Sequence, residues 1–271
     1  MTAATLTGRR AAGSGAGTWR AFRAVLWRDL YVTGRELPVF LAQVVLQPLF
    51  LLFVFGRILT DLGYAKGGYV TLLFPGIVAL TSVLTGLQST AFPLVIDFSF
   101  TKEIEDRLLA PLPVALVAVE KMVFAALRAL TAAGIMFPIG LLVLGTLHLR
   151  AAGAPLLALT LVLGSFVGAG MGMAIGTSVP PTRINIVFAL VLTPLLFTGC
   201  SQYPWPSLSS LRWFQVVTAA NPLTYVSEAT RAALVPGVPH MAAWISVLVM
   251  VFAVSVFGWL GIRGFNRRAI D

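Results

Sequence analysis

Six long apolar stretches constrain the fold of this chain more than any other feature of its sequence. They cover residues 38–55, 69–96, 122–147, 155–177, 185–199 and 241–262, and within them only Arg128 carries a charge. A hydrocarbon core about 30 Å thick takes about 20 apolar residues per helical crossing. No stretch alternates apolar and polar residues as membrane β-strands do. The sequence therefore predicts an all-α integral membrane protein, with six transmembrane helices over residues 37–263.

The distribution of basic residues predicts the orientation. If the N-terminus is cytoplasmic, the segments on that side hold most of the arginines and lysines, and the opposite side holds only Arg57, Lys66, Arg150, Arg212 and Arg231. Positive residues favour cytoplasmic loops, so both termini, residues 1–17 and 264–271, are predicted to be cytoplasmic tails. The net charge of +9 is scattered and forms no continuous basic face. Anionic lipid is therefore a better partner for it than nucleic acid.

Several kinds of chemistry have little support in the sequence. One cysteine, Cys200, and two histidines, His148 and His240, argue against a disulfide framework and against a metal site. The chain has no GxxxxGK[ST] phosphate-binding loop, which argues against ATP binding by that motif. All acidic residues fall in predicted loops, tails or helix ends, whereas ion-coupled transporters usually need a carboxylate within the membrane. The energy for any transport is therefore expected to come from elsewhere.

A charged segment, EIEDRLLAPLP from Glu103, separates the second and third apolar stretches. Its carboxylates fall in the first turns of a predicted helix over residues 99–110, where the helix dipole favours them. Phe100, Ile104 and Leu108 recur on one face, and two prolines then end the helix. Helices that lie on lipid usually carry a basic polar face, but acids outnumber bases here. The segment is therefore predicted to be a short amphipathic helix that contacts a protein.

Two further short helices flank the predicted bundle. Residues 18–36 place Trp19, Phe22, Leu26 and Leu30 on one helical face, which is typical of a helix at the membrane interface. The sequence NPLTYVSEATRAALVPG from Asn221 begins with a capping residue and ends at a Pro-Gly pair. That helix is too short to cross a bilayer.

These elements, in this order, resemble the type 2 ABC-exporter permeases of the drug and polyketide kind over nearly the whole chain. The resemblance implies that the 99–110 helix lies in a cleft of a separate nucleotide-binding subunit, and that the 18–36 connecting helix touches the same subunit. The residues it assigns to ATPase coupling are Glu103, Ile104, Glu105, Asp106, Arg107, Leu108, Trp19, Phe22 and Arg23. It also implies short re-entrant helices over residues 203–236 that close the outer mouth, with Asn221, Pro222, Tyr225, Glu228 and Arg231 as the external gate.

The polar residues within the spans suggest a substrate pathway. Gln43 and Gln47 lie one turn apart in the first span, and Thr85 and Gln88 share a stripe in the second span with Thr81, beside Ser82 and Ser89. Hydrogen bonds between helices are the alternative explanation, especially in the second span. Gly164, Gly168, Gly172 and Gly176 recur every fourth residue and predict a close helix contact.

Two sets of charges leave their structural and functional interpretations open. Arg128 is expected to reach the cytoplasmic interface, to pair with Glu120 or Asp97, or to face a water-filled cavity. Glu228 and Arg231, three residues apart, form either an ion pair worth about 0.3 kcal/mol or a gate whose charges separate on opening.

The sequence thus predicts a permease subunit of an ATP-driven exporter in a bacterial plasma membrane, with a lipophilic or amphipathic substrate such as a drug, antibiotic or lipid. The chain would bind no cofactor itself. ATP and Mg²⁺ would be held by two partner ATPase subunits, and a second permease, identical or paralogous, would complete the assembly. A lipid-linked glycan exporter of the same superfamily, a membrane-embedded enzyme and an ion-coupled secondary transporter remain open. Abundant alanine and an excess of arginine over lysine suggest a GC-rich bacterial genome.

Overall fold

The structure, a computed structural model, describes residues 15–64, 68–98, 113–145 and 151–270. Within these ranges the chain forms helices and no strand. Six helical segments are long and apolar enough to cross a membrane: Leu37–Asp61, Tyr69–Ile96, Val114–Leu144, Ala151–Ser178, Pro181–Thr198 and Ala243–Ala269. The predicted all-α fold with six spans is confirmed.

The helices follow the apolar stretches closely. An N-terminal helix α1 (Gly15–Arg35) precedes the first span, which combines α2 (Leu37–Leu51), the π-helix η1 (Leu52–Ile58) and α3 (Leu59–Asp61). The next spans are α4 (Tyr69–Ile96), α6 (Val114–Leu144), α7 (Ala154–Ser178, after the 3-10 turn η3, Ala151–Gly153) and α8 (Ile184–Thr198, after η4, Pro181–Arg183). The 3-10 helix η5 (Trp205–Ser210), α9 (Arg212–Ala219) and α10 (Pro222–Leu234) lead to the last span, α11 (Ala243–Ile270).

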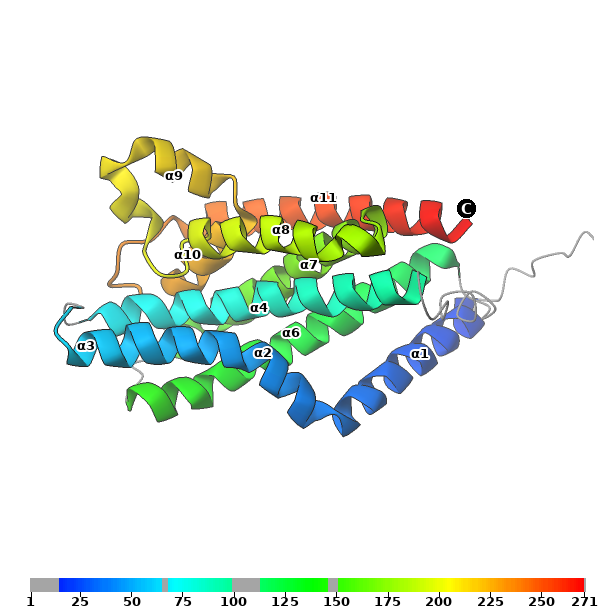
Figure 1. Cartoon of the computed structure of the whole chain (residues 1–271), viewed down its shortest axis with the longest axis horizontal. Coiled ribbons are helices and arrows are strands. Elements are labelled where there is room, and N and C mark those ends of the chain that lie inside the picture. The colour runs from blue at the N-terminus through cyan, green and yellow to red at the C-terminus, as the bar shows by residue number, and fades with distance from the viewer. Residues whose placement is uncertain (1–14, 65–67, 99–112, 146–150, 271) are drawn as a thin grey trace, which may run out of the picture.

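The spans lie side by side, with α4 among them (Figure 1). The helix α1 leans away from α2 at one end of the bundle, and the C-terminal end of α11 lies toward that same end. The helix α9 lies at the opposite end. An even number of crossings returns the chain to the side of the membrane where it began, so this placement agrees with six spans.

The centre of the bundle is the contact between α4 and α7, which glycine makes possible. A Cβ atom on Gly168 would lie 2.1 Å from the carbonyl oxygen of Val83, and one on Gly172 would lie 2.3 Å from that of Leu87. One on Gly164 would meet the Val226 side chain of α10 at 2.6 Å. The predicted packing face is therefore real, and its partners are α4 and α10 of the same chain.

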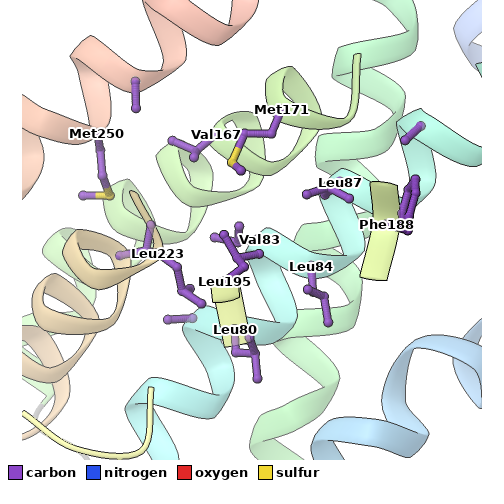
Figure 2. Close-up of a cluster of buried hydrophobic side chains, with 14 of the residues drawn as sticks. Leu80, Val83, Leu84, Leu87, Val167, Met171, Phe188, Leu195, Leu223 and Met250 are labelled. Carbon is purple, nitrogen blue, oxygen red and sulfur yellow. The ribbon is translucent and has the colours of Figure 1, made fainter. Parts of the chain in front are cut away.

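Apolar side chains from five helices meet around this contact (Figure 2). The cluster joins α4, α7, α8, α10 and α11 through Leu80, Val83, Leu84, Leu87, Val167, Met171, Phe188, Leu195, Leu223 and Met250. In the most apolar window of α4, 83% of the residues are buried, against 22% in the first span and 17% in the fifth. The first and fifth spans are therefore peripheral, and α10 is part of the core although it is too short to be a span.

Some boundaries differ from the sequence predictions. The third span begins at Val114 and not at Met122, so Glu120 and Lys121 lie within α6 and are buried. The prediction that every acidic residue falls in loops, tails or helix ends is therefore wrong for Glu120, and also for Glu228, which lies buried in the middle of α10.

The C-terminal end of the chain also differs from expectation. Residues 264–270, expected in a tail, continue α11, with Phe265 buried. Arg268 there donates hydrogen bonds to the backbone oxygens of Gly176, Thr177 and Val179 at the end of α7. The 99–110 helix and most of the 1–17 tail lie outside the described residues.

Candidate functional site

A pocket of about 1070 Å³ lies between α1, α2, α4 and α6. It arises where the chain bends between its first two helices. Glu36, with φ −104° and ψ 15°, interrupts the helical path, and Pro38 in the first turn of α2 has no N–H to continue the hydrogen bonds of α1. Figure 1 shows α1 leaning away from α2 at this bend, and residues of both helices, of α4 and of α6 line the pocket.

The wall of the pocket is amphipathic. Apolar surface comes from Val25, Val39, Phe40, Pro93 and Phe124, and polar groups come from Arg28, Asp29, Glu36, Gln43, Ser89, Thr90, Asp97, Lys121 and Arg128. Such a lining suits a ligand with one polar end and one apolar body.

Two ion pairs account for four of the charged side chains that line the pocket. Lys121 Nζ lies 2.7 Å from Asp97 Oδ2, and these side chains are only 10% and 11% exposed. Arg28 Nε lies 3.3 Å from Asp29 Oδ1 at the α1 wall. Asp97, one of the two carboxylates considered as a partner of Arg128, is paired with Lys121 instead.

Arg128 faces the pocket from α6. It is the fifteenth residue of that helix, about 21 Å along its axis from Val114. Its guanidinium lies 4.1 Å from the centre of the Phe40 ring and 5.6 Å from that of Phe124. Its Nε atom is buried without a hydrogen-bond partner, and within the described ranges no carboxylate lies within salt-bridge distance of it. Of the expectations for this residue, the structure places it against the cavity.

The structure does not bring the four predicted pathway residues together. Gln43 lines the pocket, whereas Gln47, one turn further on, is exposed outside it. Thr85 is buried and Gln88 is half-buried, and neither lines the pocket. Ser89 and Thr90 of α4 do. Ser82 bonds to Leu161 O and Ser165 Oγ of α7, so a hydrogen bond between helices is the correct explanation at that position.

At the opposite end of the bundle, residues 200–241 form what we call the cap segment. Asn221 caps α10, with its Oδ1 accepting a hydrogen bond from Leu223 N at 2.9 Å, and Pro222 occupies the first turn, as predicted. The Asn221 amide also donates to Leu195 O and Thr198 Oγ1 of α8. Tyr225 donates its hydroxyl to Ala219 O at 2.8 Å. The cap segment is thus tied to the end of the fifth span.

The pair Glu228 and Arg231 is fully buried in the cap segment. Their side chains are 0% exposed, with Arg231 Nη1 2.5 Å from Glu228 Oε1. Glu228 accepts hydrogen bonds from the backbone N–H of Trp205 at 2.9 Å and of Met241 at 2.7 Å. Arg231 donates to Cys200 O at 3.0 Å and to Leu72 O of α4 at 3.4 Å. The pair therefore bonds to the backbone of four residues outside α10, in α4, in the stretch after α8 and just before α11.

Burial governs the titration of this region. Loss of water lowers the pKa of Arg231, and the Glu228 carboxylate opposes that shift. Burial also raises the pKa of the Cys200 thiol to about 11. Cys200 has φ 51°, an unusual conformation for a residue with a side chain, and this turns its carbonyl into the range of Arg231.

Comparison with known proteins decides the family. A model of the ABC-2 type transporter family matches residues 20–235, about four fifths of the chain. The chain belongs to the ABC-2 type transporter family. A search of curated proteins gave no match to it. The matched range runs from α1 to the end of α10, so it contains both the pocket and the Glu228–Arg231 pair.

In this ABC-2 transporter protein the predicted coupling residues divide into two groups. Trp19, Phe22 and Arg23 lie on α1, where Phe22 is buried and stacks on the exposed Trp19 with ring centres 5.5 Å apart. Arg23 is exposed. The other group, Glu103, Ile104, Glu105, Asp106, Arg107 and Leu108, lies outside the described residues.

The sequence did not predict two sets of contacts in the ABC-2 protein, those between pocket side chains and those of the Glu228–Arg231 pair with backbone groups. The Asp97–Lys121 pair and the contact of Arg128 with Phe40 depend on how α4, α2 and α6 meet, which no local pattern reveals. The contact of Arg128 with Phe124, four residues earlier on α6, could have been found from the spacing. The partners of Glu228 and Arg231 are backbone groups, which every residue possesses, so they leave no sequence signal. The spacing of the two charges was the only clue to their contact.

Proposed function

We propose that this chain is the transmembrane permease subunit of an ATP-driven exporter for a lipophilic or amphipathic substrate. The observation that carries the proposal is the contrast between the two ends of an ABC-2 bundle. The end beside α1 holds an amphipathic pocket of about 1070 Å³. At the other end the buried Glu228–Arg231 pair holds the cap segment against α4. This is the arrangement expected of a permease that receives substrate on one side and is closed on the other.

The proposed assembly contains two permeases and two ATPase subunits that hold ATP and Mg²⁺. Closure of the ATPases would push on residues 99–110 and on α1. Because α1 forms one wall of the pocket, its displacement would change the shape of the pocket directly. Residues 203–236 would then open as the outer gate.

The proposed location is a bacterial plasma membrane, with both termini and the pocket on the cytoplasmic side. The basic residues of the N-terminal tail, α1 and the end of α11 support this orientation. The cap segment would then face the exterior.

A pull-down tests the partner directly. We expect the detergent-solubilised, tagged chain to copurify with a soluble ATPase that carries a phosphate-binding loop, identified by mass spectrometry. Glu105→Arg should abolish that recovery and any substrate-stimulated ATPase activity, because it reverses a charge in the predicted coupling helix.

The matched control is Asp61→Arg, the same charge change at an exposed position on the first span. It should leave the ATPase bound. Equal recovery with the Glu105 variant would remove the proposed role of residues 99–110, and absence of any ATPase in several mild detergents would contradict the exporter function.

A further inference from the structure

The guanidinium of Arg128 indicates the chemistry of the ligand that the pocket accepts. A charged side chain within a span is costly unless it finds a partner or water, so its partner is the first thing to identify. Arg128 has two aromatic neighbours, Phe40 and Phe124. Rings contact the faces of a guanidinium and leave the N–H groups at its edge available for hydrogen bonds.

The other charges of the pocket offer no counter-charge in contact with it. Asp97 is engaged by Lys121 at 2.7 Å, and Asp29 lies against Arg28 at 3.3 Å. Glu36 lines the same pocket and its charge acts on Arg128 from a distance, but it is exposed at the α1–α2 bend and forms no salt bridge with Arg128. Because the Glu36 carboxylate faces water, solvent and salt screen its charge. It therefore compensates the charge of the half-buried Arg128 guanidinium only weakly.

We propose that the pocket binds the anionic headgroup of an amphiphilic substrate, with Arg128 as the headgroup-binding residue. A phosphate or carboxylate would accept two parallel hydrogen bonds from the guanidinium fork. The Gln43 amide, which lines the same pocket from α2, adds a neutral hydrogen-bonding group. Val39, Phe40 and Phe124 supply apolar surface for the body of the molecule.

This inference rests on the proposed export function and specifies its substrate class. An anionic bilayer phospholipid presents the same chemistry as an anionic substrate in transit, so an experiment must separate the two sources.

Ligand binding to the purified full-length chain tests the proposal without the ATPase. The chain is placed in phosphatidylcholine nanodiscs, and binding of radiolabelled dodecyl phosphate is measured with empty discs subtracted. We expect unlabelled dodecyl phosphate and dodecanoate to displace the label and dodecyltrimethylammonium, of equal chain length, to fail. Equal displacement by the cation would overturn the proposal, and this comparison needs no variant.

Variants then assign the effect to one residue. Arg128→Gln should weaken the binding of dodecyl phosphate at least tenfold. Arg128→Lys keeps the positive charge but loses the paired N–H groups of the guanidinium, so its affinity should lie between those of Arg128→Gln and the wild type. Asp61→Asn, which removes an exposed acid outside the pocket, should bind as well as the wild type. Unchanged affinity in monodisperse Arg128→Gln protein would refute the assignment.

The lipid composition of the disc separates the two sources. With one fifth of the lipid replaced by phosphatidylglycerol, dodecyl phosphate should still bind. Its displacement by phosphatidylglycerol would contradict a substrate site and assign the anion to the bilayer. The pull-down and the binding assay fail independently, since one needs residues 99–110 and the other needs only the pocket.

Discussion

At the scale of single residues, the Glu228–Arg231 pair shows how burial changes the meaning of a sequence pattern. Two charges three residues apart on an exposed helix contribute a few tenths of a kcal/mol. Here both side chains are fully buried and bond to the backbone of four other residues. Removing one member of a buried pair leaves an uncompensated charge and costs about 3–5 kcal/mol. The spacing predicted the contact, but only the fold shows its importance.

We therefore expect Glu228→Gln to lower the thermal stability of the solubilised protein sharply, because Arg231 loses its counter-charge in a fully buried site. Size-exclusion chromatography after heating measures the loss. Asp61→Asn, which breaks the exposed Arg57–Asp61 pair with side chains 55% and 62% exposed, serves as the control and should have almost no effect. Similar melting temperatures for the two variants would contradict a structural role for the buried pair.

At the scale of helices, the sequence predicted which segments are helical better than it predicted which helices contact one another. Length and hydropathy fixed six spans, and Asn221 with Pro222 marked the start of α10 correctly. The glycines of α7 predicted a close contact, but nothing in their spacing named α4 as the neighbour. Of the predicted pathway residues, Gln43 lines the pocket and Thr85 does not. The side of a helix that faces a pocket depends on the helices packed around it, which the sequence of one helix does not reveal.

A pair of glycine-to-alanine substitutions tests the α4–α7 contact. Gly168→Ala places a Cβ atom 2.1 Å from Val83 O, so the helices must separate, and overpacking of this kind costs about 1–3 kcal/mol. Gly134 of α6 has no atom within 4 Å of the added methyl group. Gly134→Ala should therefore be neutral or stabilising, since alanine favours a helix over glycine by about 1 kcal/mol.

Thermal melting of both variants in the same detergent measures this difference. Gly168→Ala should melt below the wild type and Gly134→Ala at or above it. Equal melting temperatures for the two variants would show that α4 and α7 are not in backbone contact.

At the scale of the whole molecule, orientation can be tested because the native thiol is inert. Cys200 is 0% exposed and its pKa is raised to about 11, so at pH 7 about one thiol in ten thousand is the reactive thiolate. Gly17 at the start of α1 and Ser209 in η5 are both exposed. We expect a membrane-impermeant maleimide to label Ser209→Cys in intact spheroplasts, and to label Gly17→Cys only after the membrane is opened.

The unmodified chain is the control and should remain unlabelled in both preparations at pH 7. Because the thiolate fraction rises with pH, any background from Cys200 should grow as the pH approaches 11. Labelling of Gly17→Cys in intact spheroplasts would contradict the proposed orientation and place the N-terminal end of α1 outside the cell.

The glycine contact between α4 and α7 also limits where cargo can travel. Where Val83 O and Leu87 O meet α7, there is no room even for a methyl group, and so none for water or an acyl chain. Backbone against backbone also offers no side-chain rotamers that could swing aside to make room. A translocation route must therefore pass around this seam, and the pocket, to which α7 contributes no lining residue, lies off it.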